Sequence, residues 1–383
     1  MAIPTYDELF KQIKTNFWLC GLPYGDDKIH VRFYVLLLLI ILMLVEEIGF
    51  FVSKISSENI LELTQLAPCM GIGFLSMLKI VAIASKRCKI FALSEKLRCL
   101  YEEILKDPVK IRTTKRNLTF VKAFTKYFFI LNAILISVYN FSTLVIILYN
   151  YLTKRVVIFK LPYAVLLPFP TDSWLPWFVV YVHSVSCGFI CVLYFTTVDV
   201  LYFLLTSHIC CNFSVISSKI QCLNVSNTAC LREIVKSHQY ILKLSEDLED
   251  IFTAPNLFNV LIGSIQLCAL GFNLTTGDLA RYPGNILFLS SVILQILMMS
   301  VFGENIIQES TKVGDAAFMC KWYEMDIKSK KTILTIMIRA HKPQRLTAYK
   351  FSVISYGSFS KIISTSWSYF TILRTVYKSP ERK

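Results

Sequence analysis

The sequence predicts an all-α fold, a polytopic membrane protein with seven transmembrane helices, and three observations carry that prediction. The chain has 383 residues, of which 55% are hydrophobic and 17% are charged, whereas soluble domains carry more charge than this. The apolar residues gather in blocks of about 20, the length at which a helix crosses a bilayer. Most of the charged residues stand in the segments between these blocks.

Seven apolar blocks follow one another along the chain. We expect the spans at 33–52, 60–84, 128–149, 177–206, 255–274, 285–302 and 349–377. The segment 1–32 is mixed in charge and lacks a basic start followed by an apolar run, so we expect no cleavable signal peptide. We expect 1–32 to be cytoplasmic, 303–348 to be a cytoplasmic anchor connection, and 378–383 to be an extracellular tail.

A few polar residues stand inside or beside the helical stretches. Glu46 and Glu47 are near the end of the first span, where we expect them to reach the interface or a water-filled vestibule. Lys79, near the end of the second span, is expected to extend its ammonium group to the interface. Asp199 lies deep in the fourth span, where a hydrogen bond to a neighbouring helix is favoured over an ion site. His238 has no partner at a ligand spacing, so we expect it to pack or cap and not to bind metal.

The connections between the spans differ in kind. The charged stretches 85–126, 208–254 and 304–325 are expected to be helical, and 85–126 to extend the second and third spans into water. The connection 150–176 contains several prolines, which rule out a regular helix. Its apolar residues are expected to pack onto the outer surface of the protein.

The distribution of positive charge predicts the orientation. Lys and Arg are concentrated in the connections after the second, fourth and sixth spans, on the side of the amino terminus. The three opposite loops contain only Lys54, Lys154, Arg155, Lys160 and Arg281. Because cytoplasmic loops carry the excess of positive charge, we expect an intracellular amino terminus and an extracellular carboxyl terminus. The formal net charge of +14 then belongs to a cytoplasmic rim that meets anionic lipid, and not to a nucleic-acid surface.

The last expected span is rich in serine and threonine, for which lipid offers no hydrogen-bond partner. Six of its residues recur at spacings that place them on one helix face: Thr365, Ser368, Tyr369, Ile372, Thr375 and Val376. A face of tyrosine, isoleucine and threonine suits a narrow, wettable pore with one apolar constriction. A packing seam between helices is the alternative, and the spacing alone favours the seam.

The carboxyl-terminal third carries a family resemblance. The residues that carry it are Phe302-Gly303-Glu304-Asn305-Ile306-Ile307-Gln308-Glu309-Ser310, Ala316-Ala317-Phe318, Trp322-Tyr323, Ala340-His341-Lys342-Pro343, Thr347-Ala348, Ser358-Phe359 and Ser368-Tyr369-Phe370. With these motifs and its inverted seven-span topology, the chain resembles the insect odorant receptors. The likeness covers the whole chain as topology and reaches the level of motifs from about residue 302 onward. Thr375-Val376, where the gustatory receptors have a Gln-Phe pair, favours the odorant branch.

The resemblance implies a tuning subunit of a ligand-gated, cation-conducting tetramer that assembles with an obligate co-receptor. It also implies a plasma-membrane location, in the dendrite of an olfactory neuron. The intracellular ends of spans four to seven would form the contact between subunits, and the second half of span seven would line the pore. Alignment on Ser368-Tyr369-Phe370 puts the apolar gate at Ile372 and the neighbouring polar pore position at Thr375.

The resemblance further implies an odorant pocket within 33–302, in the outer half of the membrane among spans two, three, four and six. A small volatile ligand needs a dry pocket with one or two polar anchors, and methionines and aromatic residues suit tolerant recognition. The candidate ligand-binding residues are Met70, Phe74, Met77, Ser137, Tyr139, Asn140, Phe141, Leu144, Ser184, Cys187, Phe189 and Cys191. Asn273, in the sequon Asn273-Leu274-Thr275 near the outer face, is a candidate for glycosylation.

Other functions are less well supported. The alternatives are a gustatory-type chemoreceptor channel and a metabotropic seven-helix receptor. The inverted orientation opposes the second, as does the lack of Asp-Arg-Tyr and Asn-Pro-x-x-Tyr motifs. A secondary transporter would have internal repeats and broken helices, which are not clear here. An enzyme is not expected, because no nucleophile with a base, metal cluster or phosphate loop stands out, and we expect no cofactor, metal or nucleic-acid partner.

Overall fold

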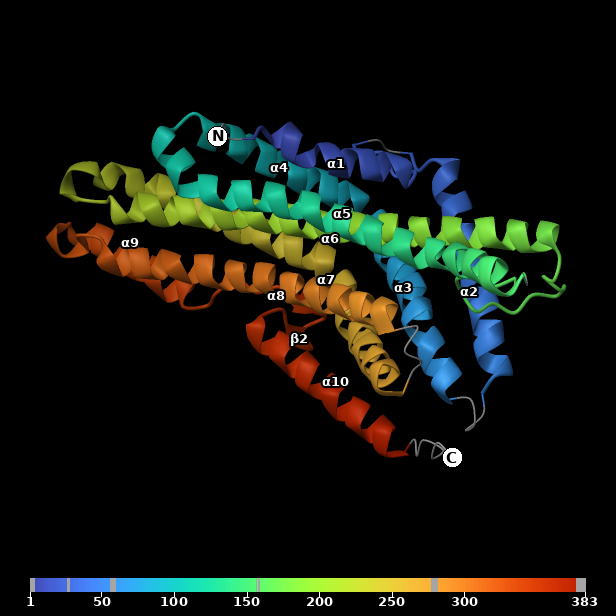
Figure 1. Ribbon diagram of the computed structural model, residues 1–383. Coiled ribbons are helices and arrows are strands. Elements are labelled where there is room, and N and C mark those ends of the chain that lie inside the picture. Colours follow the sequence, from blue (N-terminus) through green and yellow to red (C-terminus); the bar gives the residue numbers. More distant parts are fainter. Residues whose placement is uncertain are drawn as a thin grey trace.

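The computed structural model of the protein describes residues 4–25, 28–55, 60–155, 157, 159–276 and 282–376. It is a bundle of α-helices (Figure 1), which confirms the all-α fold class. The α-helices are α1 (Tyr6–Leu19), α2 (Val31–Ser53), α3 (Ile60–Ser85), α4 (Arg87–Leu105), α5 (Pro108–Lys154), α6 (Trp174–Gln221), α7 (Leu231–Thr276), α8 (Tyr282–Met319), α9 (Ile327–Ala340) and α10 (Tyr356–Val376). The shorter described elements are the 3-10 helices η2 (Val225–Cys230) and η4 (Trp322–Glu324) and the strands β1 (Thr347–Ala348) and β2 (Ser352–Val353).

Within the described ranges, six helices are long and apolar enough to cross a membrane: α2, α3, α5, α6, α7 and α8. They contain the first six expected spans. α10 has 21 residues, which makes it about 30 Å long and close to the thickness of the hydrocarbon core. α10 is not among the six helices named above, because its many hydroxyl side chains lower its hydropathy. With α10 as the seventh helix, the arrangement agrees with the seven-helix prediction.

Four of these helices are much longer than a bilayer is thick. α5, α6, α7 and α8 have 47, 48, 46 and 38 residues, whereas about 20 suffice for a crossing. They therefore continue beyond the expected spans into the charged connections. The charged connections are largely helical, as expected, and α5 extends the third span. The expected extension of the second span is wrong, because α3 ends at Ser85 and α4 is a separate helix within the connection 85–126.

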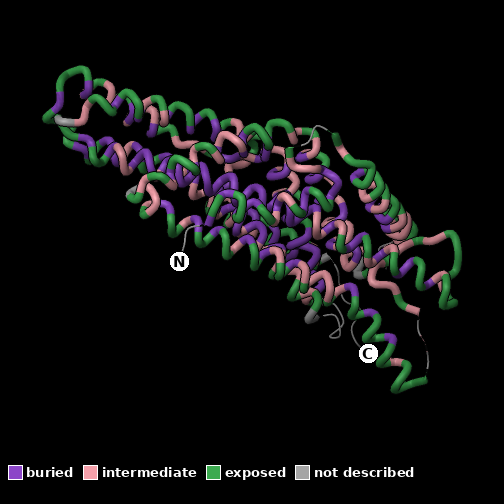
Figure 2. The backbone as a smooth tube through the Cα atoms, turned by 90° about the horizontal axis from the view of Figure 1, so that it is seen from above, coloured by how far each residue is buried: buried purple, intermediate pink, exposed green. Residues whose placement is uncertain are grey.

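α6 is the most deeply buried of the long helices. Figure 2 shows buried residues along the middle of the molecule and exposed residues along the helices at its edges. Aromatic rings fill the space around α6. Phe203 stacks on Phe302 of α8 with 4.6 Å between ring centroids and meets Phe128 of α5 edge-on at 5.6 Å. Such ring pairs contribute about 0.5–1.5 kcal/mol beyond the burial of their area, so they help to hold α5 and α8 against α6.

Pro68 interrupts the hydrogen bonds of α3, and two side chains of α7 compensate. A proline has no N–H, so the carbonyl of Thr64, four residues earlier, loses its partner within the helix. Asn273 donates a hydrogen bond to this Thr64 oxygen at 2.9 Å, and Gln266 donates to the Pro68 oxygen at 3.1 Å. Gly71 lets Gln266 approach, because a Cβ there would lie 2.9 Å from the Gln266 amide nitrogen. The proline site is therefore a joint between α3 and α7.

The last helix begins later than expected, at Tyr356 and not at residue 349. The preceding residues form the antiparallel β1–β2 hairpin, in which Thr347 lies opposite Val353. At its turn Tyr349 and Lys350 have φ angles of 48° and 63°. This left-handed conformation is incompatible with a right-handed helix. The last helix therefore cannot begin at residue 349, as the sequence predicts.

The hairpin is fixed to α7 by side-chain hydrogen bonds. The Tyr349 backbone N–H donates to the Thr253 hydroxyl at 2.9 Å, and the Thr347 hydroxyl donates to the Glu249 carboxylate at 2.8 Å. The base of α10 is thus tied to α7 before the helix begins. The expected helix end at 377 and the tail 378–383 lie outside the described residues.

Candidate functional site

A buried ion pair lies inside the bundle. The ammonium nitrogen of Lys79 on α3 is 2.7 Å from a carboxylate oxygen of Asp199 on α6, and both side chains are almost wholly buried. The same ammonium group lies 4.7 Å from the centre of the Phe195 ring. The expectation that Lys79 reaches the membrane interface is therefore wrong. A charge in apolar surroundings is so unfavourable that it pairs within the bundle when a partner is in reach.

Two amides complete the network around Asp199. Gln295 of α8 donates to its second carboxylate oxygen at 3.0 Å, and the same amide nitrogen lies 2.9 Å from the Asn259 side-chain oxygen on α7. Four helices, α3, α6, α7 and α8, therefore meet at one polar centre. The expected interhelical hydrogen bond of Asp199 is confirmed. Sequence reasoning missed its partner Lys79, although opposite charges placed deep in two spans usually pair.

A second polar cluster lies where the loop before α6 meets the bundle. The hydroxyl of Tyr163 in this loop donates a hydrogen bond to the Asn140 side-chain oxygen on α5 at 2.9 Å. The ring of Tyr139 lies 5.4 Å from that of Tyr163, and its hydroxyl is 3.1 Å from the Cys69 sulfur on α3. Gly188 of α6 makes the room, because a Cβ there would clash with the Tyr163 hydroxyl. The loop therefore inserts a tyrosine among the helices, beyond the surface packing that the sequence predicts.

Several predicted pocket residues are buried or half-buried within the bundle. Ser184, Cys187 and Cys191 are buried and share one face of α6. The Cys187 sulfur lies 3.4 Å from the Leu39 carbonyl oxygen, so this face is turned toward α2. The others are half-buried: Met70, Phe74 and Met77 on α3 and Ser137 on α5, whose hydroxyl bonds to its own helix.

Three predicted pocket residues lie on the outside of the bundle. Phe141, Leu144 and Phe189 are 45%, 39% and 37% exposed, which contradicts their placement in an interior pocket. Phe141 and Phe189 lie near each other on this outer surface, with 6.4 Å between ring centroids. One residue advances a helix by about 100°, so Phe141 points away although its neighbour Asn140 points inward.

The predicted glycosylation site is also contradicted. Asn273 is 1% exposed, and its amide nitrogen is committed to the Thr64 carbonyl oxygen. A sugar acceptor must stand at the surface, whereas Asn273 faces the interior between α7 and α3. In this structure its amide group donates to the carbonyl oxygen that Pro68 leaves without a partner in α3.

Two adjacent carboxyl groups of α2 approach the same end of the bundle. Glu47 is 3% exposed and Glu46 is half-buried, so the expectation that both carboxyl groups reach the interface or a water-filled vestibule is wrong for Glu47. The Glu46 carboxylate lies 3.9 Å from the His183 ring nitrogen on α6. Its backbone oxygen accepts a hydrogen bond from Leu166 of the loop at 3.1 Å. Acidic groups therefore stand close to the Tyr163 cluster.

One face of α10 packs against α7. Ile362 and Phe370 are buried, and Phe370 contacts Cys268 and Phe272. The Ser366 hydroxyl donates to a backbone oxygen of α7 at 3.2 Å. A packing seam therefore exists on this helix, but it uses other residues than the six of the expected pore face.

The other face of α10 is open. Tyr369 and Ile372 are 57% and 56% exposed, and Thr365, Ser368 and Thr375 are exposed as well. Val376 is the last residue of the helix, and its side chain lies outside the described part of the structure. Within one subunit, no described segment covers this mixed polar and apolar face.

α8 and the start of α10 touch through their backbones. A Cβ at Gly303 of α8 would clash with the carbonyl oxygen of Ile354, so only glycine permits this approach. The neighbouring Glu304 carboxylate accepts a hydrogen bond from the Tyr356 backbone N–H at 3.3 Å. A negative charge is favourable at a helix amino end. The Phe302-Gly303-Glu304 motif therefore holds the beginning of the last helix.

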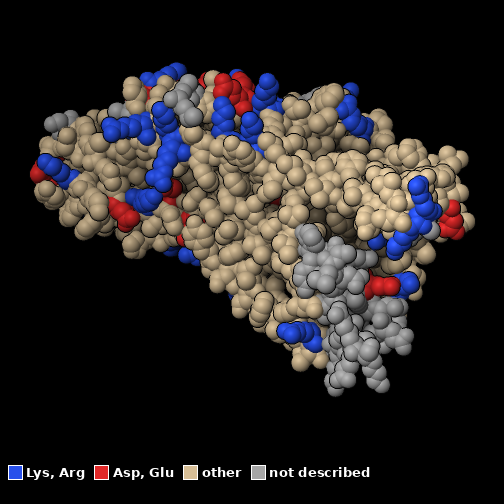
Figure 3. Space-filling model, viewed as in Figure 1, with Lys and Arg blue, Asp and Glu red and all other residues tan. Residues whose placement is uncertain are grey.

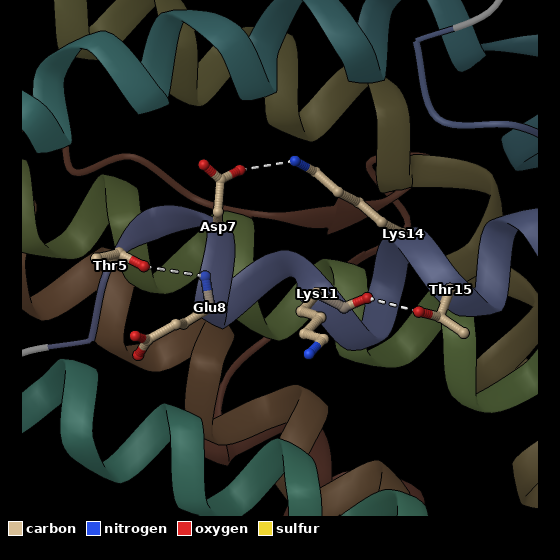
Figure 4. A pocket seen from close by; sticks show the side chains of 6 residues that line it. All are labelled: Thr5, Asp7, Glu8, Lys11, Lys14 and Thr15. Atoms are coloured by element: carbon tan, nitrogen blue, oxygen red, sulfur yellow. Dashed lines mark hydrogen bonds and ion pairs between the residues drawn. The ribbon is translucent and has the colours of Figure 1, made fainter.

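Two of the acidic residues that line a hollow on the surface of α1 already pair with lysines of the chain. It is lined by Thr5, Asp7, Glu8, Lys11, Lys14 and Thr15 (Figure 4). Asp7 pairs with Lys14 at 2.8 Å, and this hydrogen bond holds the pKa of Asp7 below its usual value. Glu8 pairs with Lys122 of α5 at 3.1 Å. The Glu8–Lys122 pair connects α1 to α5.

Across the residues that the structure describes, no cluster of His, Cys, Asp or Glu could hold a metal ion.

Comparison with known sequences points in one direction. A sequence model of the family described as 7tm Odorant receptor matches residues 59–367. Putative odorant receptor 92a of Drosophila melanogaster is 26% identical over 398 residues, covering 97% of this chain and 96% of the relative. Odorant receptor 13a of the same species is 31% identical over 248 residues, covering 58% of this chain and 59% of the relative. Odorant receptor 67c is 28% identical over 360 residues, covering 88% and 86%.

The fold is similar to that of a solved insect receptor. The olfactory receptor OR5 from Machilis hrabei in complex with eugenol matches with a TM-score of 0.78 at 16% identity, covering 97% of this chain and 100% of that chain. A second structure of OR5 matches with a TM-score of 0.79 at 17% identity, covering 96% and 98%. The likeness in fold therefore extends over almost the whole chain.

Proposed function

The chain belongs to the 7tm odorant receptor family, and on this premise we propose that it is the odorant-binding, tuning subunit of a ligand-gated, non-selective cation channel. Membership of this family makes the chain a membrane receptor and not an enzyme.

The observation that carries the channel proposal is the open face of α10. When subunits surround a common axis, equivalent faces of the same helix meet at that axis. The hydroxyls of Thr365, Ser368 and Thr375 would then line a wettable path, and Ile372 would form the apolar constriction together with the side chains at the equivalent position of the other subunits. Tyr369 and Val376 belong to the same face by helical period. We therefore assign the gate to Ile372 and the adjoining polar position to Thr375.

The partner subunits are the odorant co-receptor, in a tetramer that also contains this chain. The anchor connection 303–348 supports a subunit contact, because it carries large exposed apolar side chains. Phe318, Met319, Ile327 and Ile338 are 62%, 73%, 73% and 63% exposed. Exposed apolar surface of this kind is typical of protein–protein interfaces.

The orientation places the amino terminus in the cytoplasm and the carboxyl terminus outside the cell, in the plasma membrane of an olfactory dendrite. In Figure 3 most Lys and Arg atoms of the face drawn lie over the part of the bundle that includes α4 and α9, and the central surface is largely uncharged. The excess of positive charge marks the cytoplasmic side of a membrane protein. The uncharged surface suits the lipid tails.

The ligand pocket is proposed at the Tyr163 cluster, at the outer end of the bundle. Tyr139, Asn140, Ser184, Cys187 and Cys191 provide polar and polarizable groups there, and the half-buried methionines of α3 provide adaptable apolar surface. The OR5 receptor of similar fold was solved with eugenol, which supports the view that this fold holds small organic molecules. The permeant ions are cations, and the ligand is a small volatile compound.

Electrical recording tests the function directly. The chain would be expressed with an insect odorant co-receptor, and whole-cell current would be measured while a panel of volatile compounds is applied. We expect ligand-evoked cation current from cells that express both proteins, and a different ligand profile from cells with the co-receptor alone. A second-messenger signal without current would favour the metabotropic alternative. Absence of current from every ligand, with both proteins at the cell surface, would refute the channel proposal.

A further inference from the structure

The helix α2 presents a continuous apolar stripe to the outside of the bundle. The exposed residues of this stripe include Val31, Tyr34, Val35, Leu38, Leu42 and Val45. They recur every three or four residues, which places them on one face of the helix. An exposed apolar face on a helix that is long enough to cross a membrane contacts the lipid tails. Because the stripe begins at Val31, the start of α2 marks one edge of the hydrocarbon region.

The end of α1 lies against this edge. The His30 backbone N–H, just before α2, donates to the Gly21 carbonyl oxygen at 3.0 Å. A Cβ at Gly21 would clash with the backbone of Phe33, so the chain after α1 touches the first turn of α2. Trp18 and Leu19, in the last turn of α1, are 53% and 40% exposed. Tryptophan is enriched where membrane meets water, so these two side chains are placed at the interface.

A positive charge is held at the same junction. The guanidinium carbon of Arg32 lies 4.3 Å from the centre of the Trp18 ring, and its Nη1 donates to the Trp18 carbonyl oxygen at 3.2 Å. The Arg32 side chain is exposed. A guanidinium group has five N–H donors in a planar fork, and this fork matches two oxygens of a phosphate. The ring and the carbonyl therefore orient the fork and leave donors for a ligand.

Other basic side chains around α1 have carboxylate partners. Lys14 lies 2.8 Å from Asp7, and Arg98 of α4 lies 3.3 Å from Glu102. The printed contacts of Arg32 in the described part of the chain are with an aromatic ring and a carbonyl group, neither of which carries a negative charge. Arg32 therefore offers a cation beside an apolar surface, a combination that fits an amphiphile.

We propose that the junction of α1 and α2 binds an anionic phospholipid, with the phosphate on the Arg32 guanidinium and an acyl chain along the stripe of α2. The inference requires that α2 spans a membrane and is independent of conduction and of the odorant pocket. A net negative headgroup is favoured, because a zwitterionic headgroup carries its own cation beside the phosphate. Under the proposed orientation the site lies in the cytoplasmic leaflet, where the anionic lipids are concentrated.

Fluorescence of Trp18 tests the site locally. The full chain, purified in detergent, would be titrated with phosphatidylserine or phosphatidylcholine that is brominated in one acyl chain, because bromine quenches a nearby indole. The chain has five tryptophans, so the contribution of Trp18 is the difference between wild type and Trp18→Phe. We expect phosphatidylserine to quench this contribution at a concentration about tenfold lower than phosphatidylcholine, which corresponds to a charge-assisted hydrogen bond.

Variants of the arginine decide which group causes the preference. Arg32→Gln is expected to abolish the preference for phosphatidylserine, and the control Arg98→Gln is expected to retain it, because Arg98 already pairs with Glu102. Arg32→Lys keeps the charge without the planar fork and should retain part of the preference. This variant tests the same contact if Arg32→Gln does not fold.

Three outcomes would overturn the inference and leave the channel proposal in place. The first is equal quenching by both lipids, or a preference that Arg32→Gln retains. The second is loss of the preference in both Arg32→Gln and Arg98→Gln, which would show a general effect of net charge. The third is displacement of brominated phosphatidylserine by glycerophosphoserine, the headgroup without chains, since a site that accepts free phosphate esters does not use the stripe of α2. We expect glycerophosphoserine in tenfold excess to leave the quenching unchanged.

Discussion

The ammonium group of Lys79 and the carboxylate of Asp199 lie 2.7 Å apart and join α3 to α6 inside the bundle. Removal of one partner from a buried ion pair costs about 3–5 kcal/mol, because the remaining charge stays buried without compensation. Gln295 and Asn259 extend the same contact to α8 and α7. The pair therefore secures the relative positions of the helices around α6.

Lys79→Met is expected to lower the stability of the receptor by about 3–5 kcal/mol. Thermal unfolding of the purified protein and labelling of the receptor at the cell surface would measure the loss. The double variant Lys79→Met with Asp199→Leu should regain much of it, because no charge remains buried. Lys54→Met is the matched control, since its pair with Glu62 is exposed and contributes about 0–1 kcal/mol. Equal unfolding of the Lys79 and Lys54 variants would contradict the structural role of the pair.

Asn273→Ala is expected to destabilise the receptor by about 1–3 kcal/mol, because the Thr64 carbonyl loses the donor that replaces the missing N–H of Pro68. Thermal unfolding checks this value. Thr275→Ala is the matched control, since it destroys the sequon and leaves the Asn273 hydrogen bond in place. Electrophoretic mobility should be the same for wild type and both variants, with and without endoglycosidase. A shift that both variants abolish would show that Asn273 carries a sugar after all.

Gly303→Ala is expected to uncouple α8 from the start of α10. The added Cβ meets the backbone carbonyl of Ile354, which cannot rotate away as a flexible side chain could, and overpacking of this kind costs about 1–3 kcal/mol. We expect ligand-evoked current to fall sharply at matched surface expression. Gly284→Ala is the control, because a Cβ there has no neighbour within 4 Å in the described structure. Similar currents from both variants would exclude Gly303 from the coupling.

The helices of this fold could be predicted because their signals are local. Hydropathy places α2 and α3 within a few residues of their bounds and locates the apolar part of each of α5–α8, and helical period indicates that the charged connections are largely helical. The start of α10 could not be predicted, since two consecutive residues other than glycine, Tyr349 and Lys350, adopt positive φ angles. Such a conformation is uncommon for these residue types. It is held by contacts with Thr253 and Glu249, about a hundred residues earlier in the chain.

The candidate site could be predicted only in part, because it also depends on contacts between residues that are far apart in the sequence. Both sides of a membrane helix are apolar, so helical period cannot tell a lipid-facing residue such as Phe141 from an interior one. The partner of Asp199 is a lysine 120 positions away. The insertion of Tyr163 depends on the space that Gly188 leaves on another helix. These contacts belong to the tertiary structure.

The open face of α10 yields the most direct prediction about conduction. Ile372→Ala removes the bulk of the proposed constriction and is expected to increase the current in the absence of ligand. Thr375→Lys places a positive charge in a cation path, and an electrostatic barrier of about 1.4 kcal/mol already lowers flux about tenfold. Trp367→Phe is the control, because Trp367 is exposed on another side of α10. Voltage-clamp recording at equal surface expression would measure leak, conductance and block. Unaltered values for both Ile372→Ala and Thr375→Lys would remove α10 from the ion path.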